Sequence, residues 1–462
     1  MGKAIDKLRN NKFVKTISNI FKIEDLRTRI LITLAFVAVY RFGSYVVLPG
    51  IDTQALASLH EQTTGGLMSL LDMFSGGAFS KASIFALGIM PYISASIVMQ
   101  LLGLAVPYFQ KMQREGESGR RKMNQYTRYL TIAILLVQGP SFLFNLERIT
   151  QGTALYSSLQ ASGGWTWFYI YSTIILAAGS MFILWLGERI TDKGIGQGVS
   201  LIIMIGIIAR FPEAIKQEFS TSLDSMNSGG LIGFLVEIVV LLVVIAAAIL
   251  LVQGVRRVPV QYAKRVVGNR QYGGARQYIP LKPYAANVMP IIFAQAIMFI
   301  PLTLIDFMGV QQNTVTAQLV DHTSALYNVI LAVLIIVFTY LYTAITINPT
   351  QMAEDMKRNN GFIPGVKPGK NTAEYLDRIM SRITLPGSLF LAFIAIMPAF
   401  ASLFGVQQSF AQFFGGTSLL ILVGVVLDTL QHIESHLLMR HYDGLLETGR
   451  IRGAHANIGG AY

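Results

Sequence analysis

Residues able to do catalytic chemistry are few in this sequence. His432 and His436 lie four residues apart with Glu434 between them. In a zinc protease the glutamate directly follows the first histidine, so this spacing does not form that site. The sequence contains no cysteine, which excludes disulfides and thiolate chemistry. We therefore expect no catalytic residue and no metal site.

A glycine-rich stretch superficially resembles a nucleotide-binding loop. Gly365 and Gly369 enclose three residues, and Lys370 is followed by Asn371. A phosphate-binding loop needs four residues between its glycines and serine or threonine directly after the lysine. The stretch therefore predicts no ATP site, and we expect no cofactor.

The composition is that of a protein that crosses a membrane several times. Of 462 residues, 53% are hydrophobic and 13% are charged, against about 25% charged residues in a soluble domain. Several stretches approach the ~20 apolar residues that a bilayer crossing needs. Lipid cannot satisfy open backbone groups, so these stretches must be helices.

We expect an all-α polytopic membrane protein with ten transmembrane helices. The predicted cores of the helices are residues 30–48, 82–106, 129–144, 169–186, 198–215, 231–252, 285–304, 326–347, 384–403 and 413–436.

The net charge of +12 comes from basic residues that gather on one side of this topology. They lie in the N-terminal segment, after spans two, four, six and eight, and in the C-terminal tail. The positive-inside rule makes this side cytoplasmic, with both termini inside. Residues 1–25 are either an amphipathic helix on the inner leaflet or a frayed basic tail.

Short sequence matches relate two halves of five spans. Residues 90–95 and 289–294 both read M-P-x-I-x-A, in spans two and seven. Residues 198–203 and 416–421 both read G-x-S-L-[IL]-I, in spans five and ten. Because five is odd, the second half enters from the opposite side, which makes the repeat inverted.

The residues at the matched positions of this repeat are aliphatic. They are Ile93, Ile203, Ile292 and Ile421. If their helices converge, they form an apolar constriction that blocks ions by dewetting; otherwise they are ordinary packing.

Two functions follow from the repeat, a gated channel and an inverted-repeat secondary transporter. A transporter would place charged or unwound groups near the midplane. We expect Arg41 and Asp428 to be the only charges well inside spans, and the sequence assigns no role to either.

Ten motifs, in order along nearly the whole chain, resemble those of the SecY family in its bacterial form. They are residues 72–80 (DMFSGGAFS), 82–96 (ASIFALGIMPYISAS), 115–122 (EGESGRRK), 125–129 (QYTRY), 187–196 (GERITDKGIG), 262–265 (YAKR), 280–282 (PLK), 348–349 (NP), 361–365 (GFIPG) and 414–421 (FGGTSLLI).

The resemblance implies a protein-conducting channel and not an enzyme. It would pass unfolded secretory polypeptides across the bacterial cytoplasmic membrane and release hydrophobic segments sideways into it. An aliphatic pore ring would close the channel. The positions that match this ring are Ile89, Ile93, Val199, Ile203, Ile292 and Ile421, with Val199 a mild departure from isoleucine.

The resemblance also implies a plug at about residues 67–80 and a lateral gate between spans two and seven. The plug residues are Leu67, Leu71, Met73, Phe74, Ser75, Gly76 and Gly77. Without the resemblance this segment reads as a plain external loop. The gate residues are Ser94, Gln100, Asn287 and Gln295, whose alternative role is interhelical packing.

The cytoplasmic loops at about 253–284 and 348–382 are expected to dock partners. The first is rich in Lys and Arg with no acidic residue, which favours an acidic or RNA-bearing partner. The resemblance implies the ribosome and the SecA ATPase at one site, with Lys367 in place of the family's usual arginine. The expected docking residues are Arg256, Arg257, Lys264, Arg265, Arg270, Arg358 and Lys367.

Further partners implied by the resemblance are SecE, SecG, signal peptides, nascent secretory or membrane proteins, and membrane lipids. The expected organisation is a cytoplasmic segment at 1–25, a first half at 26–220, a second half at 221–436 and a cytoplasmic tail at 437–462.

Overall fold

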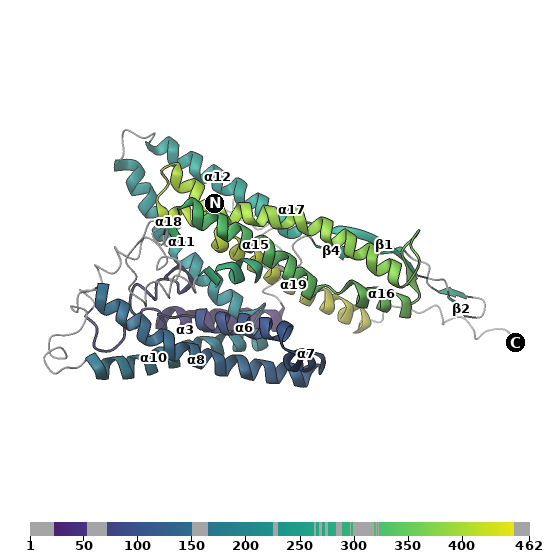
Figure 1. Cartoon of the computed structure of the whole chain (residues 1–462), viewed down its shortest axis with the longest axis horizontal. Coiled ribbons are helices and arrows are strands. Elements are labelled where there is room, and N and C mark those ends of the chain that lie inside the picture. Colours follow the sequence, from purple (N-terminus) through teal and green to yellow (C-terminus); the bar gives the residue numbers. More distant parts are fainter. Residues whose placement is uncertain are drawn as a thin grey trace, which may run out of the picture.

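The computed structural model describes residues 23–52, 72–149, 165–224, 230–262, 265–267, 270–272, 276–282, 289–295, 297–298, 318–319, 321 and 323–447. Residues 1–22 of the predicted amphipathic segment at 1–25, and most of the tail, lie outside these residues. In Figure 1, α3, α6, α8 and α10 form one layer of helices and α12, α15, α17 and α19 form another.

The first layer and its connections come from the first half of the chain. Its helices are α3 (Glu24–Gly43), α6 (Met90–Ala105), α7 (Pro107–Arg114), α8 (Glu117–Ile149), α10 (Trp165–Lys193) and α11 (Gly198–Asp224). The second half supplies α12 (Gly230–Gln253), α15 (Ala325–Thr346), α16 (Pro349–Arg358), α17 (Lys370–Leu403), α18 (Gln408–Ala411) and α19 (Gly416–Glu447).

Among the described residues, seven helices are long and apolar enough to cross a membrane, or eight if the bent pair of α6 and α7 is one span. Each of the ten predicted cores overlaps a helix, including α3 and residues 289–295. α3 is not among the seven, and charged residues lie near both of its ends, from Glu24 to Arg41. The chain is thus a multi-pass helical protein, and the count of ten remains a prediction.

The predicted start of span two at residue 82 is wrong. Residues 84–89 form turns, and α6 begins only at Met90, with Pro91 in its first turn. Proline is favoured there because its missing N–H is not needed by the helix. Before it, Ala82 and Gly88 have φ of 43° and 55°, which a continuous helix does not allow. Pro91 therefore starts a helix and does not interrupt one.

The second repeat motif is placed equivalently in the two halves. α11 begins at Gly198 and α19 begins at Gly416, which are the first residues of the two matched motifs. The two helices pack against each other. The aliphatic residues of both motifs therefore enter the same region of the core.

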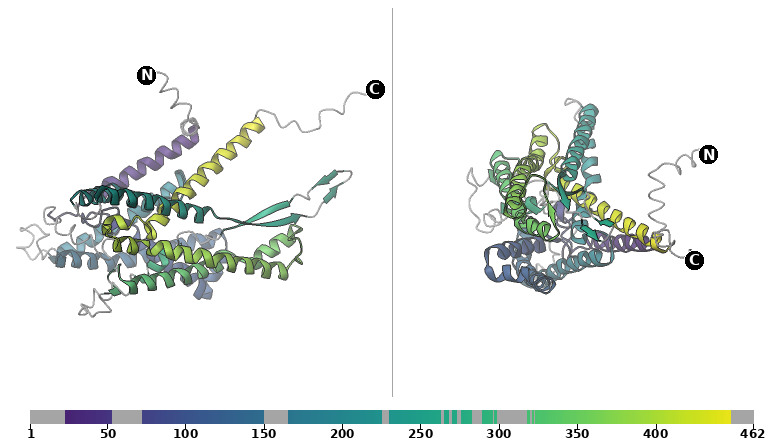
Figure 2. Two further views of the ribbon diagram at one scale, coloured as in Figure 1. Left: turned by 90° about the horizontal axis from the view of Figure 1, so that it is seen from above. Right: turned by 90° about the vertical axis from the view of Figure 1, so that its right-hand side faces the viewer.

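A small antiparallel sheet joins the two long loops that were predicted to be cytoplasmic. Its strand order is β4 (Arg276–Leu281), β1 (Arg256–Tyr262) and β5 (Gly361–Phe362). β2 (Arg265–Val267) pairs with β3 (Arg270–Tyr272) farther out. Figure 2 shows β2 and β3 projecting beyond the helices.

The inner face of this sheet has a hydrophobic core of its own. Val258 and Val260 alternate with exposed residues along β1 and pack with Leu281, Met356 and Leu376. The two loops therefore form one body. The sequence does not predict this union, because the strand β5 that joins the two loops is only two residues long.

This pairing predicts a specific disulfide in a chain that has no natural cysteine. Gln261 lies opposite Phe362, and opposed Cα atoms are about 4.5–5.5 Å apart, within disulfide reach. We expect Gln261→Cys with Phe362→Cys to cross-link rapidly under mild oxidation, measured as a mobility shift.

Arg257→Cys with Phe362→Cys is the matched control, because Arg257 lies four residues along the strand, about 13 Å away. Equal cross-linking of both pairs would contradict a fixed register between the loops.

Candidate functional site

The six residues predicted to form a ring meet in one hydrophobic cluster. Ile89, Ile93, Ile203 and Ile421 belong to its buried core, each at most 9% exposed, and Val199 and Ile292 pack against them half-buried. They come from the start of α6, the starts of α11 and α19, and the helix at 289–295. Branched aliphatic side chains from both halves therefore fill this part of the core.

A cavity of about 440 Å³ lies on one side of these aliphatic residues. Ile93, Val199, Ile203 and Ile292 line it together with polar residues, among them Gln100, Lys282 and Asp428. Lys282 directly follows the sheet strand β4, so this cavity lies on the side of the predicted cytoplasmic loops. Asp428, to which the sequence assigned no role, therefore faces the cavity, with His432 3.9 Å away.

The described part of the predicted plug lies buried against the same cluster. Met73 and Phe74 belong to its core, and Ser75 is buried beside them. This burial does not fit a plain external loop. Leu67 and Leu71 lie outside the described residues.

Gly76 and Gly77 allow the close approach of this segment to α11. Their φ angles are 66° and 86°, which glycine adopts at little cost. A Cβ on Gly76 would lie 2.8 Å from the Cα of Gly206 in α11. These glycines are therefore needed for a tight turn and a backbone contact.

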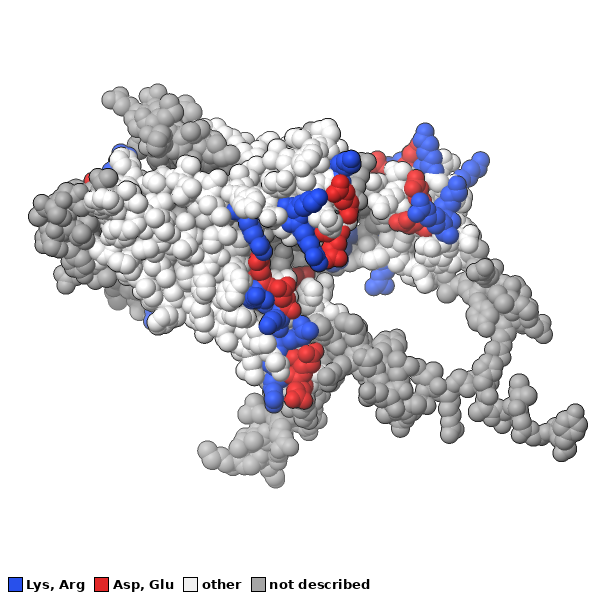
Figure 3. All heavy atoms as spheres, turned by 90° about the horizontal axis from the view of Figure 1, so that it is seen from below, with Lys and Arg blue, Asp and Glu red and all other residues white. Residues whose placement is uncertain are grey.

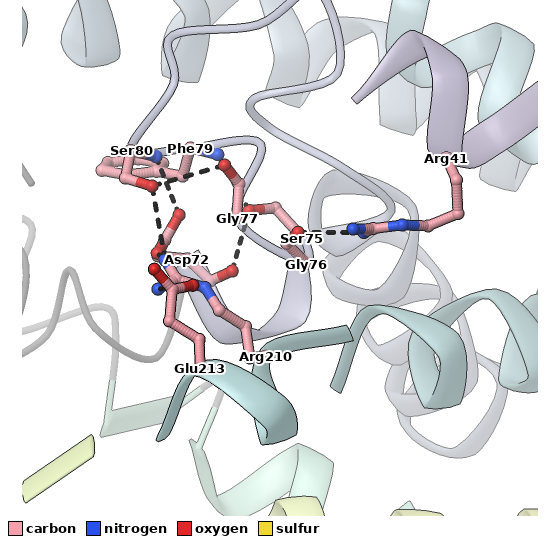
Figure 4. Close-up of polar contacts among 9 residues, drawn as sticks. All are labelled: Arg41, Asp72, Ser75, Gly76, Gly77, Phe79, Ser80, Arg210 and Glu213. Carbon is pink, nitrogen blue, oxygen red and sulfur yellow. Dashed lines mark hydrogen bonds and ion pairs between the residues drawn. The ribbon is translucent and has the colours of Figure 1, made fainter. Parts of the chain in front are cut away.

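Two arginines hold the segment through polar contacts (Figure 4). Arg210 of α11 forms an ion pair with Asp72 and donates to Ser80 Oγ at 3.3 Å. Arg41 of α3 donates to the carbonyl oxygen of Gly76 at 3.0 Å. The neighbouring Tyr40 hydroxyl donates to the carbonyl of Ser75 at 3.2 Å.

The statement that Arg41 and Asp428 are the only charges inside spans is wrong. Arg210 lies within the predicted core 198–215, and Glu237 lies within 231–252. The spacing of residues along α11 could have indicated Arg210. One face of the helix carries residues at intervals of three or four, namely Val199, Ile203, Gly206 and Arg210.

A family model for SecY matches residues 83–430 of this sequence. The chain belongs to the SecY family. Among similar curated proteins is the protein translocase subunit SecY of Streptomyces scabiei, which is 42% identical over 92% of this chain and 98% of its own length.

Solved structures of similar fold are known as well. One described as a protein-conducting channel has a TM-score of 0.59 at 17% identity, covering 94% of this chain and 95% of that one. Canine Sec61 in a ribosome-channel complex has a TM-score of 0.56 at 16% identity, covering 94% and 95%. At these identities the likeness concerns the fold, which is that of the SecY family.

The amides assigned to the SecY-type gate do not bond to each other across spans two and seven in the described residues. Gln100 donates to Ser96 Oγ in its own helix at 3.3 Å. Gln295 is buried and donates to Thr417 Oγ1 of α19 at 2.9 Å. Ser94 is half-buried, and Asn287 lies outside the described residues. The described hydrogen bond of Gln295 thus ties span seven to span ten.

The expected docking residues lie on the body formed by the two loops. Arg256 and Arg257 are exposed on β1, and Arg358 and Lys367 are exposed on the second loop. Arg265 and Arg270 lie in the outer strands, and Lys264 lies outside the described residues. Figure 3 shows basic and acidic residues in bands beside a broad uncharged surface, as expected where lipid covers the helices.

The contact of Gln295 with Thr417 predicts coupled stability effects. We expect Gln295→Leu and Thr417→Val each to lower the free energy of unfolding, and the double variant to lose less than the sum. The coupling should be about 0.6 kcal/mol, typical of hydrogen bonds between membrane helices. Unfolding in mixed micelles measures it, and additive effects would contradict the bond.

Proposed function

We propose that this chain is the protein-conducting channel of a bacterial Sec translocase. It passes unfolded secretory polypeptides across the cytoplasmic membrane and releases hydrophobic segments laterally into the lipid. One observation carries the proposal: an aliphatic cluster from both halves borders a cavity on the loop side and includes Met73 and Phe74 of the buried plug segment. Catalysis has no part in it.

The aliphatic ring suits such a channel physically. Ile89, Ile93, Val199, Ile203, Ile292 and Ile421 offer no fixed hydrogen-bond partner, so no single substrate side chain is retained. When empty, an apolar constriction excludes ions by dewetting. A secondary transporter would need polar coordinating groups where the repeat halves meet. The matched positions of the repeat hold isoleucine instead, at Ile93, Ile203, Ile292 and Ile421.

The lateral opening in this proposal lies between α6 and the helix at 289–295, beside Ser94, Gln100, Asn287 and Gln295. A small cavity of about 90 Å³ supports this place, because Gln100 and Leu101 of α6 line it opposite Phe293 and residues of α15. Loose packing at this seam lets the helices separate at low cost.

The proposed setting is the inner membrane, with both termini in the cytoplasm. SecE and SecG complete the complex, and SecA and the ribosome dock on the body that carries Arg256, Arg257, Arg358 and Lys367. The exposure of these basic residues on one folded unit supports a shared site. Signal peptides enter from the cavity that Lys282 and Asp428 line.

A cysteine at the ring tests the channel directly. Ile292→Cys gives the chain a single thiol facing the cavity. A secretory polypeptide with one cysteine of its own, stalled partway across, should form a disulfide with it. Ile291→Cys is the matched control, because Ile291 is fully buried.

A cross-link at Ile292 that requires the stalled chain is the expected result. If an engaged complex gives no cross-link at Ile292, Ile93 or Ile421, the ring is only packing and the transporter hypothesis returns.

Charge reversal tests the docking body. We expect Arg257→Glu to weaken binding of SecA to membranes several-fold at low salt and less at high salt, because exposed charges act through a screened field. Fluorescence titration measures the affinity. Arg148→Glu is the control, since Arg148 is exposed at the opposite end of α8, and equal weakening by both would contradict the assignment.

A further inference from the structure

The contacts between the plug segment and α11 share one face of that helix. Ile203 packs in the ring cluster, Gly206 lies against the backbone of Phe74 and Gly76, and Arg210 pairs with Asp72. These residues are spaced by three and four along the helix, so they line one stripe. The ring and the anchor of the plug therefore belong to the same rigid element.

The ion pair is well placed to hold the segment. The Asp72 side chain is 3% exposed and that of Arg210 is 21% exposed. Asp72 Oδ1 also accepts from the backbone N–H of Ser80 at 2.7 Å, and Arg210 donates to Ser80 Oγ. Arg210 thus contacts the segment at both ends of the turn that runs from residue 72 to 80 (Figure 4).

The polar contacts described for the segment all lead to the first half of the chain. Arg210 lies in α11, and Arg41 and Tyr40 lie in α3. Toward the second half, Met73 lines a pocket with Gln295 and Thr417, a contact made by an apolar side chain. The plug segment is therefore held by polar contacts on one side and meets the other side without them.

We propose that Arg210 is a positioning residue that latches the plug shut through Asp72, and so sets how strong a signal must be to open the channel. The inference rests on the proposed channel function. In the closed position the pair keeps both charges compensated away from water, so opening the channel gives up the net free energy of that pair. A variant that keeps only one partner leaves an uncompensated buried charge, which disfavours the closed position. A signal peptide that binds the open state must supply that free energy.

The expected effect is a shift toward the open state when either partner is neutralised. Arg210→Gln and Asp72→Asn should each raise the ion conductance of the idle complex by at least about tenfold. The double variant should leak no more than either single variant, because the latch is already lost. The charge swap Asp72→Arg with Arg210→Asp should leak less than the single variants.

The measurement uses the complete translocase complex in planar bilayers, with no substrate present. Arg148→Gln is the control for loss of an arginine away from the plug, and Glu213→Gln tests the acidic residue 4.0 Å from Arg210. Both should remain sealed. The same complexes are assayed for translocation of a precursor with a strong signal, which shows that each variant is assembled.

A second readout follows signal strength. The assay uses a series of precursors whose signals contain progressively fewer apolar residues. Asp72→Asn should still translocate precursors whose signals are too weak for the wild type. A variant that was merely misassembled would lose strong and weak signals alike. Asp72→Asn keeps the shape of the side chain and the acceptor for Ser80, so it remains informative if Arg210→Gln fails to assemble.

The outcomes separate the two proposals. If the wild type does not translocate, the channel function fails. If the wild type translocates but the neutralised variants stay sealed, only the latch fails. Leaks that multiply in the double variant would also overturn it, because the two residues would then act independently.

Discussion

Backbone polar groups cannot be left open in lipid, and this constraint shapes the centre of the molecule. Helices satisfy it internally, but most of residues 72–89 is not helical. Such a segment is tolerated at membrane depth only when protein surrounds it. Many of its N–H groups donate within short turns, to nearby side chains, or across the β-bridge between Val47 and Ser83. Helices of both halves surround it, the first half through polar contacts and the second half beside Met73.

Enclosing this segment accounts for several otherwise unusual residues. Gly179 in α10 allows the backbone at Ile84 to approach, because a Cβ there would lie 2.2 Å from the Ile84 carbonyl oxygen. Gly206 does the same for the plug segment. Arg41 and Arg210 lie within predicted spans because they face this polar turn, which offers a carbonyl and a carboxylate. An intramembrane charge here is thus explained by a local break in helical structure.

The two ends of the channel differ in how their polar groups are held. On the plug side, polar groups are buried and paired within the first half. On the loop side, Lys282 and Asp428 line an open cavity, and the basic residues lie on a folded body with its own core. Charged and polar side chains line this cavity together with Ile93, Val199, Ile203 and Ile292, and this arrangement supports the proposed ring.

Much of the fold was readable from the sequence because its cause is local. Long apolar runs must be helices in lipid. The two short repeats singled out Ile93, Ile203, Ile292 and Ile421, which all lie in or against one hydrophobic cluster, while the ring itself stays a prediction. The basic loops were also readable, since the charge bias follows directly from composition. The motifs along the chain identified the family.

Tertiary structure alone decided what pairs with what. Asp72 and Arg210 are 138 residues apart in the sequence. Nothing in the sequence pairs them, and they meet only because the turn at Gly76 packs on Gly206. Gln295 was expected at a gate, but its hydrogen bond goes to Thr417. β5 has only two residues, too short to be recognised without β1 beside it. Spacing predicts which face a residue occupies, but the partner on that face comes from a distant part of the chain, and local patterns hold no information about it.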